Sequence, residues 1–282
     1  MDESDQKEHG KKQKVEINSS PASSPFMEIN KNIHASNNYS DKPSKEEIIN
    51  QALSFHAQGN IAEAEKYYQY FLNEGFSDPR VLSNYGIILK QLGKLKESES
   101  YLRNAIKNKP NFANAHYNLA NTLKDLGKIE EAEKYHRIAI KLKPDFAEAH
   151  NNLGIILKDI GKSKEAEIFH RNAIKIKPEF AQAHNNLGMI LKDNAKLKEA
   201  EISFKKAIDL NPIYAEAHNN LGNTLKEIGK LKEALNSLQK AIDIRPDFAD
   251  AYNNIGILLR DIGKSNEAKI ASKKAIEINS DL

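Results

Sequence analysis

The chain contains no cysteine among its 282 residues. This absence excludes disulfide bonds and thiolate metal sites, and it fits a reducing compartment. Long apolar runs are missing too, since no stretch approaches the ~18–20 apolar residues that a membrane-spanning helix needs. The N-terminal MDESDQKEHGKKQKVEINSS has no apolar segment of the kind found in secretory signals. We therefore expect a cytoplasmic protein that does not bind a membrane.

The chain also lacks a large excess of positive or of negative charge. The formal net charge is +3, from 42 basic and 39 acidic residues, and both signs are interspersed along the chain. Nucleic-acid binding needs a clustered basic face that neutralises phosphates, so we expect no nucleic-acid partner. The sequence also shows no nucleophile with a base, no glycine-rich phosphate loop and no pair of catalytic carboxylates. It thus predicts neither an enzyme nor a cofactor site.

What the chain does contain is a proline every 34 residues, a strict period that indicates a repeat array. These prolines are Pro110, Pro144, Pro178, Pro212 and Pro246. On this register residues 45–282 divide into seven units, within which positions are counted from 1 to 34. The units are 45–78, 79–112, 113–146, 147–180, 181–214, 215–248 and 249–282. Residues 1–44 are polar and without periodicity, so we predict a disordered tail.

Each unit predicts two helices, A at about positions 2–14 and B at about positions 17–30. In helix A, apolar or small residues at positions 4, 7, 8 and 11 define one face. A glycine at position 15 then ends helix A, except where Ala195 stands and Asn194 is expected to supply the turn. Proline at position 32 ends helix B. Asp145 with Glu148, and Asp247 without a glutamate, are expected to cap the next helix A.

This pattern resembles the tetratricopeptide repeat. In the fourth unit it consists of Leu153, Gly154, Leu157, Gly161, Ala166, Ala173 and Pro178. The chain departs from the family at position 4, where the usual tryptophan is a histidine in four units, and in the first unit, which has Phe71 and Phe76 at positions 27 and 32. The resemblance implies an all-α fold, an α-solenoid in which seven helix-turn-helix units form a right-handed superhelix. Helix A would line its concave side, and the usual activity would be to hold another protein, commonly an extended peptide.

Position 6 is asparagine in every unit and lies, with positions 2, 9 and 13, opposite the buried face of helix A. These residues are Asn50, Asn84, Asn118, Asn152, Asn186, Asn220 and Asn254. Asparagine is a poor choice for a helix interior, so its recurrence needs a reason. One hypothesis is a ladder of carboxamides that pairs with the backbone of a bound peptide; the alternative is that duplication copied a tolerated residue. The resemblance favours the ladder, because the repeat superhelix of O-linked N-acetylglucosamine transferase carries a comparable one.

Two further rows flank this ladder. Position 13 is mostly acidic, and we expect its acids to contact a bound peptide as well: Asp125, Asp159, Asp193, Glu227 and Asp261. Position 12 is Lys or Arg in six units. Position 9 is asparagine in two units, and we expect Asn121 and Asn223 to contact a bound peptide as well. In four other units it is apolar: Ile87, Ile155, Met189 and Ile257. These apolar residues either form pockets for ligand side chains or are scattered surface residues. Position 5 is never lysine, which argues against capture of chaperone C-terminal carboxylates.

The histidines at position 4 suggest a metal site, but the spacing argues against one. They are His116, His150, His184 and His218. Neighbouring A helices are taken to be two helix widths apart, roughly 18–20 Å, so these rings would not converge on one ion. Pairs such as His116 with His136, or His150 with His170, provide two ligands without a third. We predict histidines packed in the core and no metal.

At the C-terminal edge, Ile276 and Ile278 keep the apolar pattern of an inner helix, and no polar capping helix follows. We expect this edge to self-associate or to contact another domain or chain. The leading hypothesis is a non-enzymatic scaffold that binds a protein or extended peptide along Asn50 to Asn254. The alternative is a substrate-recruiting arm of a glycosyltransferase-like or other multidomain enzyme whose catalytic part lies outside these residues.

Overall fold

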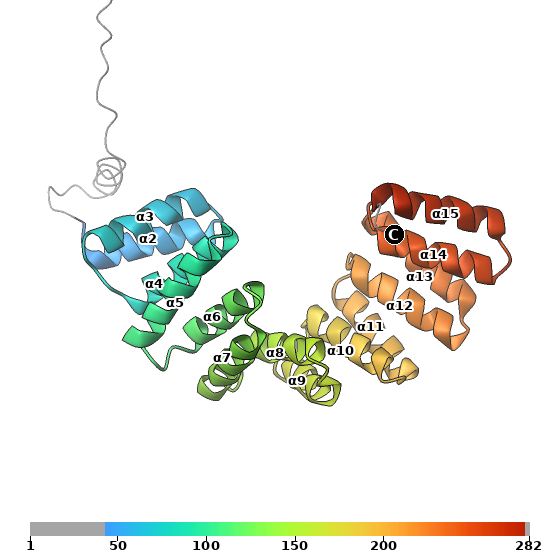
Figure 1. Cartoon of the computed structure of the whole chain (residues 1–282), viewed down its shortest axis with the longest axis horizontal. Helices are drawn as coiled ribbons and strands as arrows, with labels where there is room; N and C mark the ends of the chain where they lie inside the picture. Colours follow the sequence, from blue (N-terminus) through green and yellow to red (C-terminus); the bar gives the residue numbers. More distant parts are fainter. Residues whose placement is uncertain (1–42, 280–282) are drawn as a thin grey trace, which may run out of the picture. The chain divides into compact units, whose positions relative to one another are not determined.

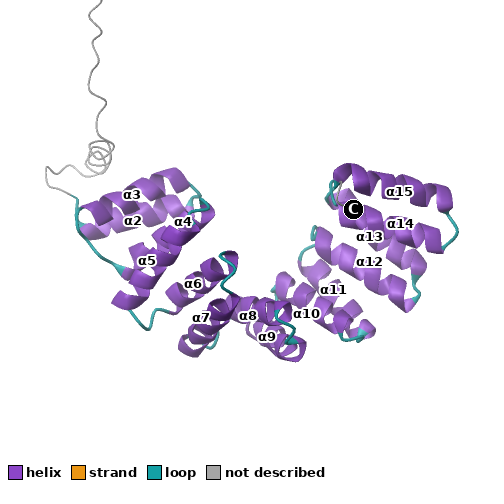
Figure 2. Cartoon of the chain, in the orientation of Figure 1, coloured by secondary structure: helices purple, strands orange, loops and turns teal. Residues whose placement is uncertain are grey.

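The computed structural model describes residues 43–279, in which every regular element is an α-helix (Figures 1 and 2). The helices are α2 Lys45–Ala57, α3 Ile61–Asn73, α4 Pro79–Gln91, α5 Leu95–Asn108, α6 Ala113–Asp125, α7 Ile129–Leu142, α8 Ala147–Asp159, α9 Ser163–Ile176, α10 Ala181–Asp193, α11 Leu197–Leu210, α12 Ala215–Ile228, α13 Leu231–Ile244, α14 Ala249–Asp261 and α15 Ser265–Ile278. None of them is both long and apolar enough to cross a membrane. The predicted disordered tail lies outside the described residues, apart from Pro43 and Ser44.

The chain forms two compact bodies that divide between Ser77 and Asp78. The first contains the helix pair α2 and α3. The second contains α4 to α15 as six consecutive pairs, and each even-numbered A helix packs against the B helix that follows it. Within the second body, each B helix also packs against the A helix of the next pair. The fold is therefore an all-α solenoid, as predicted.

Small residues at position 8 let the two helices of a pair approach closely. A Cβ added to Gly154 would lie 2.7 Å from the ring of His170, and a Cβ on Gly188 would lie 2.7 Å from the ring of Phe204. Both distances are shorter than any real carbon contact, so a larger residue would push the helices apart. The large residue at position 24 of helix B thus sits directly over position 8 of helix A.

Two details at the helix ends differ from the prediction. Ala195 itself takes the left-handed conformation, with φ 59°, while Asn194 has φ −87°. The expectation that Asn194 supplies the turn was therefore wrong. The expected caps are wrong as well: α8 and α14 have Phe146 and Phe248 at the N-cap, and neither helix end receives a side-chain cap hydrogen bond. The aspartates precede the N-cap by one residue, since each A helix begins at position 1.

The loop before each A helix is held by other contacts. The Nε2 atoms of the position-4 histidines lie 2.8–3.0 Å from the carbonyl oxygens of the preceding loop prolines, in the pairs His116–Pro110, His150–Pro144, His184–Pro178 and His218–Pro212. Lysine or arginine at position 31 also stacks on the aromatic ring at position 34, as Arg245 does on Phe248 at 3.7 Å. These contacts fix the loop between one unit and the next without a side-chain cap.

We predict that replacing Ala195 by glycine stabilises the chain. An L-residue in the left-handed region costs roughly 1 kcal/mol, which glycine avoids. The urea midpoint should therefore rise by an amount equivalent to about 0.5–1 kcal/mol, as followed by circular dichroism. The matched control is Gly161→Ala, at φ 78° with nothing within 4 Å of the added Cβ, which should destabilise by a similar amount. Equal midpoints for all three chains would contradict this account.

Candidate functional site

In the second body, the position-6 asparagines form hydrogen bonds between units. Each Nδ2 donates to the side chain at position 5 of the preceding unit. The pairs are Asn118 to Ser83 at 3.2 Å, Asn152 to Tyr117 at 3.2 Å, Asn186 to Asn151 at 3.0 Å, Asn220 to Asn185 at 3.1 Å and Asn254 to Asn219 at 2.9 Å. These asparagines therefore have a structural role that the sequence analysis missed. Asn84 is half-exposed on α4, and Asn50 is exposed on α2 in the first body.

The acceptors of this ladder are residues for which the sequence analysis assigned no role. Asn151, Asn185 and Asn219 are buried, with 3%, 4% and 7% of their surfaces exposed. The Oδ1 of Asn151 also lies 3.1 Å from the Nδ1 of His170, so one amide joins α8, α9 and α10. The signal was present in the sequence as an Asn-Asn pair at positions 5 and 6 of four units.

The bond to the preceding unit does not use up the position-6 carboxamides. Each carries one oxygen acceptor and two N–H donors, and the bond between units uses one donor, except at Asn152, where two bonds to the preceding unit use both. From Asn84 to Asn254 these residues remain half-exposed. Because the bond holds each amide in one orientation, a ligand would not have to order it, which lowers the entropic cost of binding. The result is a row of fixed, partly open amides from Asn118 to Asn254, one on each A helix from α6 to α14.

A second row links the same A helices nearer their C-terminal ends. The lysine at position 12 pairs with the acid at position 13 of the next unit at three junctions: Lys90–Asp125 at 2.8 Å, Lys158–Asp193 at 3.2 Å and Lys192–Glu227 at 3.0 Å. Three of the five acidic candidates are therefore engaged within the chain. These contacts, like the amide bonds, place neighbouring A helices side by side. The separation of roughly 18–20 Å assumed for the histidine rows is thus too large.

Position 9 lies between these two rows. Asn121 Oδ1 accepts a second bond from Asn152 Nδ2 at 2.9 Å, so Asn152 bridges Tyr117 and Asn121 of the preceding unit. Asn223 is half-buried on α12, as are Ile87, Ile155, Met189 and Ile257 on their own helices. The side of the A helices that carries these rows is therefore polar at positions 6, 12 and 13 and mixed at position 9, while position 5 is mostly buried.

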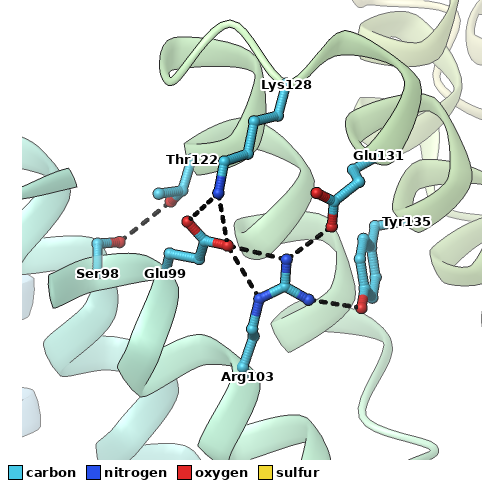
Figure 3. A network of polar contacts seen from close by, with 7 residues as sticks. All are labelled: Ser98, Glu99, Arg103, Thr122, Lys128, Glu131 and Tyr135. Carbon is cyan, nitrogen blue, oxygen red and sulfur yellow. Dashed lines mark hydrogen bonds and ion pairs between the residues drawn. The ribbon is translucent and has the colours of Figure 1, made fainter. Parts of the chain in front are cut away.

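The B helices are joined by a charged network that sequence reasoning also missed (Figure 3). Arg103 donates to Glu99 on its own helix α5 and to Glu131 on α7, while Lys128 donates to Glu99. Burial opposes the charge of Glu99, but the hydrogen bonds from Lys128 and Arg103 outweigh it and hold the pKa of Glu99 below its ordinary value. The same arrangement recurs around Glu133 and Glu167. The sequence feature that could have indicated this network is a glutamate followed four residues later by an arginine on the B helices.

Two histidines at position 24 lie deep between the helices. His136 and His170 are 0% and 1% exposed. Burial lowers the pKa of His136 to about 3 and that of His170 to about 4, with a smaller contribution in each case from the nearby positive charge of Lys124 or Lys158. Neither ring nitrogen of His136 has a hydrogen-bond partner within residues 43–279. In the next unit, Asn151 at position 5 provides an acceptor for His170. In the unit of His136, position 5 is Tyr117 instead, so this acceptor is missing.

No group of three metal-ligating side chains occurs in the described residues. The position-4 histidines instead face the proline carbonyls of the loops, so their Nε2 atoms are engaged within the chain. His116 and His136, a pair considered above, contact different aromatic rings, Tyr135 and Tyr117.

Models of the tetratricopeptide repeat match residues 79–112, 113–146, 147–180, 181–214, 203–236 and 249–282, and a TPR repeat model matches 222–263. Among solved structures, YrrB is described as a TPR protein with an unusual peptide-binding site. It is 27% identical to this chain with a TM-score of 0.53, and the match covers 64% of this chain and 93% of the YrrB chain. MamA is 26% identical with a TM-score of 0.52, and the match covers 58% of this chain and 95% of the MamA chain. The APC/C hetero-tetramer Cut9–Hcn1 is 16% identical with a TM-score of 0.72, covering 91% and 50%, and shares the fold alone. No curated protein matched the chain.

We predict that His136 and His170 make the chain less stable in mild acid. Both rings stay neutral in the folded chain but bind protons below pH 6.5 when unfolded, so stability falls as pH drops from 6.5 towards 4. At pH 5.3, where glutamates of the unfolded chain are still mostly ionised, the loss relative to pH 7 should be about 1.5 kcal/mol per histidine. Urea unfolding at the two pH values measures it.

The double variant His136→Leu with His170→Leu should show a smaller pH dependence, because Leu102 and Leu238 occupy the same position in other units. Phe204→Leu is the control, since it alters packing at position 24 without removing a titrating group. An unchanged pH dependence in the double variant would show that other groups cause the acid sensitivity.

Proposed function

Because this chain belongs to the tetratricopeptide repeat family, we propose that it is a non-catalytic scaffold that holds an extended segment of another protein against the A helices of its second body. The observation that carries this proposal is the row of half-exposed carboxamides from Asn118 to Asn254, one per unit, each oriented by a bond to the preceding unit. The similarity to YrrB, whose structure is described by its peptide-binding site, supports it.

The chemistry of the row suits a peptide backbone. An extended chain presents N–H and C=O groups at regular intervals, and the amides of the row keep an acceptor and a donor for them, except Asn152, whose two donors are both engaged within the chain. A single such bond contributes about 0.5–1.5 kcal/mol, so several in a row are needed for useful affinity. Because backbone groups are common to all sequences, this contact holds a segment largely irrespective of its side chains.

The charges beside the row support a protein partner over a nucleic acid. Lys90, Lys158 and Lys192 are each paired with an acid of the next unit, so the groove side does not offer a continuous row of free cations. A polyanion needs such a row to release its counterions. We assign the paired acids Asp125, Asp193 and Glu227 to fixing the spacing of the A helices rather than to ligand contact.

The contribution of the amides to binding can be separated from their contribution to stability. Changing Asn186, Asn220 and Asn254 to Ala removes the bonds between units and the open amides together. Changing Asn151, Asn185 and Asn219 to Ala removes the same bonds but leaves the amides in the groove. Both triple variants should lose about 0.5–1.5 kcal/mol per bond in urea unfolding. The position-6 triple should lose its partners in co-purification from native extract with the full chain as bait, whereas the position-5 triple, which keeps the amides but no longer orients them, should retain its partners at reduced recovery.

Equal recovery of partners by the position-6 triple and the wild-type chain would contradict a binding role for the amides. Equal loss by the two triples, in step with their stability, would reduce the row to a structural feature.

We also propose that the face of α15 joins a second copy of the chain. Ile270 and Ile276 are 71% and 53% exposed, and surface cavities of about 710 and 600 Å³ flank this helix. The equivalent of Ile276 one unit earlier, Ile242, is half-buried and packs in the shared core. Light scattering of the purified chain should show a mass that rises with concentration. The variant Ile270→Lys with Ile276→Lys should stay monomeric, and a wild-type chain that is monomeric at every concentration would refute the pairing.

A further inference from the structure

At two junctions between units, the ion pair that links neighbouring A helices is open. Lys124 on α6 is equivalent to the paired lysines described above, but it makes no ion pair with Asp159 on α8, although both belong to the described residues. The same holds for Lys226 on α12 and Asp261 on α14. The corresponding pairs close at 2.8–3.2 Å at the other three junctions of the second body.

The open junctions are those with asparagine at position 9. Where the ion pair closes, position 9 is Ile87, Ile155 or Met189, and where it is open, position 9 is Asn121 or Asn223. Position 9 lies one turn before position 12 on the same helix face, so an aliphatic residue there can cover the stem of the lysine. Asparagine instead adds a polar group beside the unpaired ammonium. Asparagine at position 9 and an open ion pair therefore occur together in two units, which lie three units apart in the stack.

At the α6–α8 junction, the polar groups that remain open are mostly donors. Asn152 Nδ2 donates to Tyr117 Oη at 3.2 Å and to Asn121 Oδ1 at 2.9 Å. Both oxygens are therefore occupied as acceptors, which leaves the phenol O–H and the Asn121 amide N–H groups to donate elsewhere. Lys124, one turn further along α6, adds an ammonium group. Asp159 is the acceptor on the facing helix.

We propose that these two junctions are subsites for carboxylate side chains of the bound segment, one formed by Asn121 and Lys124 and one by Asn223 and Lys226. This inference rests on the proposed function. A carboxylate accepts from an amide N–H with one oxygen and from an ammonium group with the other, a charge-assisted contact stronger than a neutral hydrogen bond. The backbone row then holds the segment, and these subsites select for aspartate or glutamate.

The charge of each subsite favours a carboxylate over a phosphate. One lysine is available, and the next helix carries Asp159 or Asp261 at the position of the paired acids, so the site does not carry the cation excess that a dianion requires. The distance between the subsites sets the spacing of the acids. Three steps of about 8–10 Å between adjacent A helices give roughly 24–30 Å, which corresponds to about eight residues of extended chain at ~3.3 Å each.

The test is a titration of the ¹⁵N-labelled full chain, followed by NMR, with two synthetic 12-residue peptides in a Gly/Ser/Thr background. One carries aspartate at its second and tenth positions and the other carries asparagine there. The aspartate peptide should bind at least five-fold more tightly, shift the side-chain amide signals of Asn121 and Asn223, and weaken as salt is added. Millimolar peptide keeps weak binding measurable.

Matched variants locate the effect. Lys124→Gln and Lys226→Gln should each weaken binding of the aspartate peptide several-fold and leave the asparagine peptide unaffected. Lys158→Gln, which removes an already paired lysine at the same position, should change neither. Asp159→Asn should tighten binding of the aspartate peptide, because it removes a facing negative charge.

The outcomes separate the two proposals. If both peptides bind equally, or if Lys158→Gln weakens binding as much as Lys124→Gln does, the carboxylate subsites are wrong while the backbone-holding groove stands. If neither peptide binds, the groove proposal fails and the subsites fail with it. Tighter binding of the same peptide with phosphoserine in place of aspartate, or of an oligothymidine strand, would assign the lysines to polyanion binding and overturn the inference.

Discussion

The hydrogen bond from position 6 of one unit to position 5 of the unit before it links the A helices on which the proposed groove depends. A helix pair cannot bury its own apolar faces, so the units must stack, and the buried face sets the approximate rotation of each A helix. The amide bond adds a specific contact near the middle of the helix. At three junctions the lysine–acid pair adds a second contact about two turns later. A helix held at two points along its length presents the same side to the groove in each unit.

The two sides of the stack are joined by different chemistry. The A helices are linked by neutral, half-buried amides and, at three junctions, by a single lysine–acid pair nearer their C-terminal ends. The B helices are linked by glutamates such as Glu99 and Glu133, whose carboxylates receive Arg and Lys from both their own and the next unit. Between the sides, Gly154 and its equivalents allow a close approach of the two helices of a pair. Where a histidine occupies this core, as at position 136, it is held neutral by burial.

Much of the fold could be predicted because its signals lie within one unit. The proline and glycine periods placed α8 and α9 to within about one residue of their observed ends, and the small residues at position 8 indicated the close helix contact. What could not be predicted depends on the neighbouring unit. A single-helix wheel puts position 5 at the margin between the two faces, and only the adjacent A helix buries Asn151 and Asn185 there. Because the contact between adjacent A helices was not foreseen, the distance between neighbouring position-4 histidines was also overestimated. Ala195 was missed because asparagine usually tolerates the left-handed region better than alanine does.

Within a stack of near-identical units, only the positions that vary can distinguish one partner from another. Under the proposed function, the constant amides at position 6 would offer every segment the same backbone contacts and would hold a ligand without choosing it. Selection would then come from residues that differ between units, such as Tyr117 at position 5 and Asn121 and Asn223 at position 9. Each coincides with a change in the surrounding bonds: Asn152 bridges two acceptors where other units have one, and the lysine–acid pair opens at both Asn121 and Asn223. If Asn121 and Asn223 were merely tolerated after duplication, the lysine–acid pair would not be expected to open beside both of them. This coincidence favours a functional role for the two asparagines over chance.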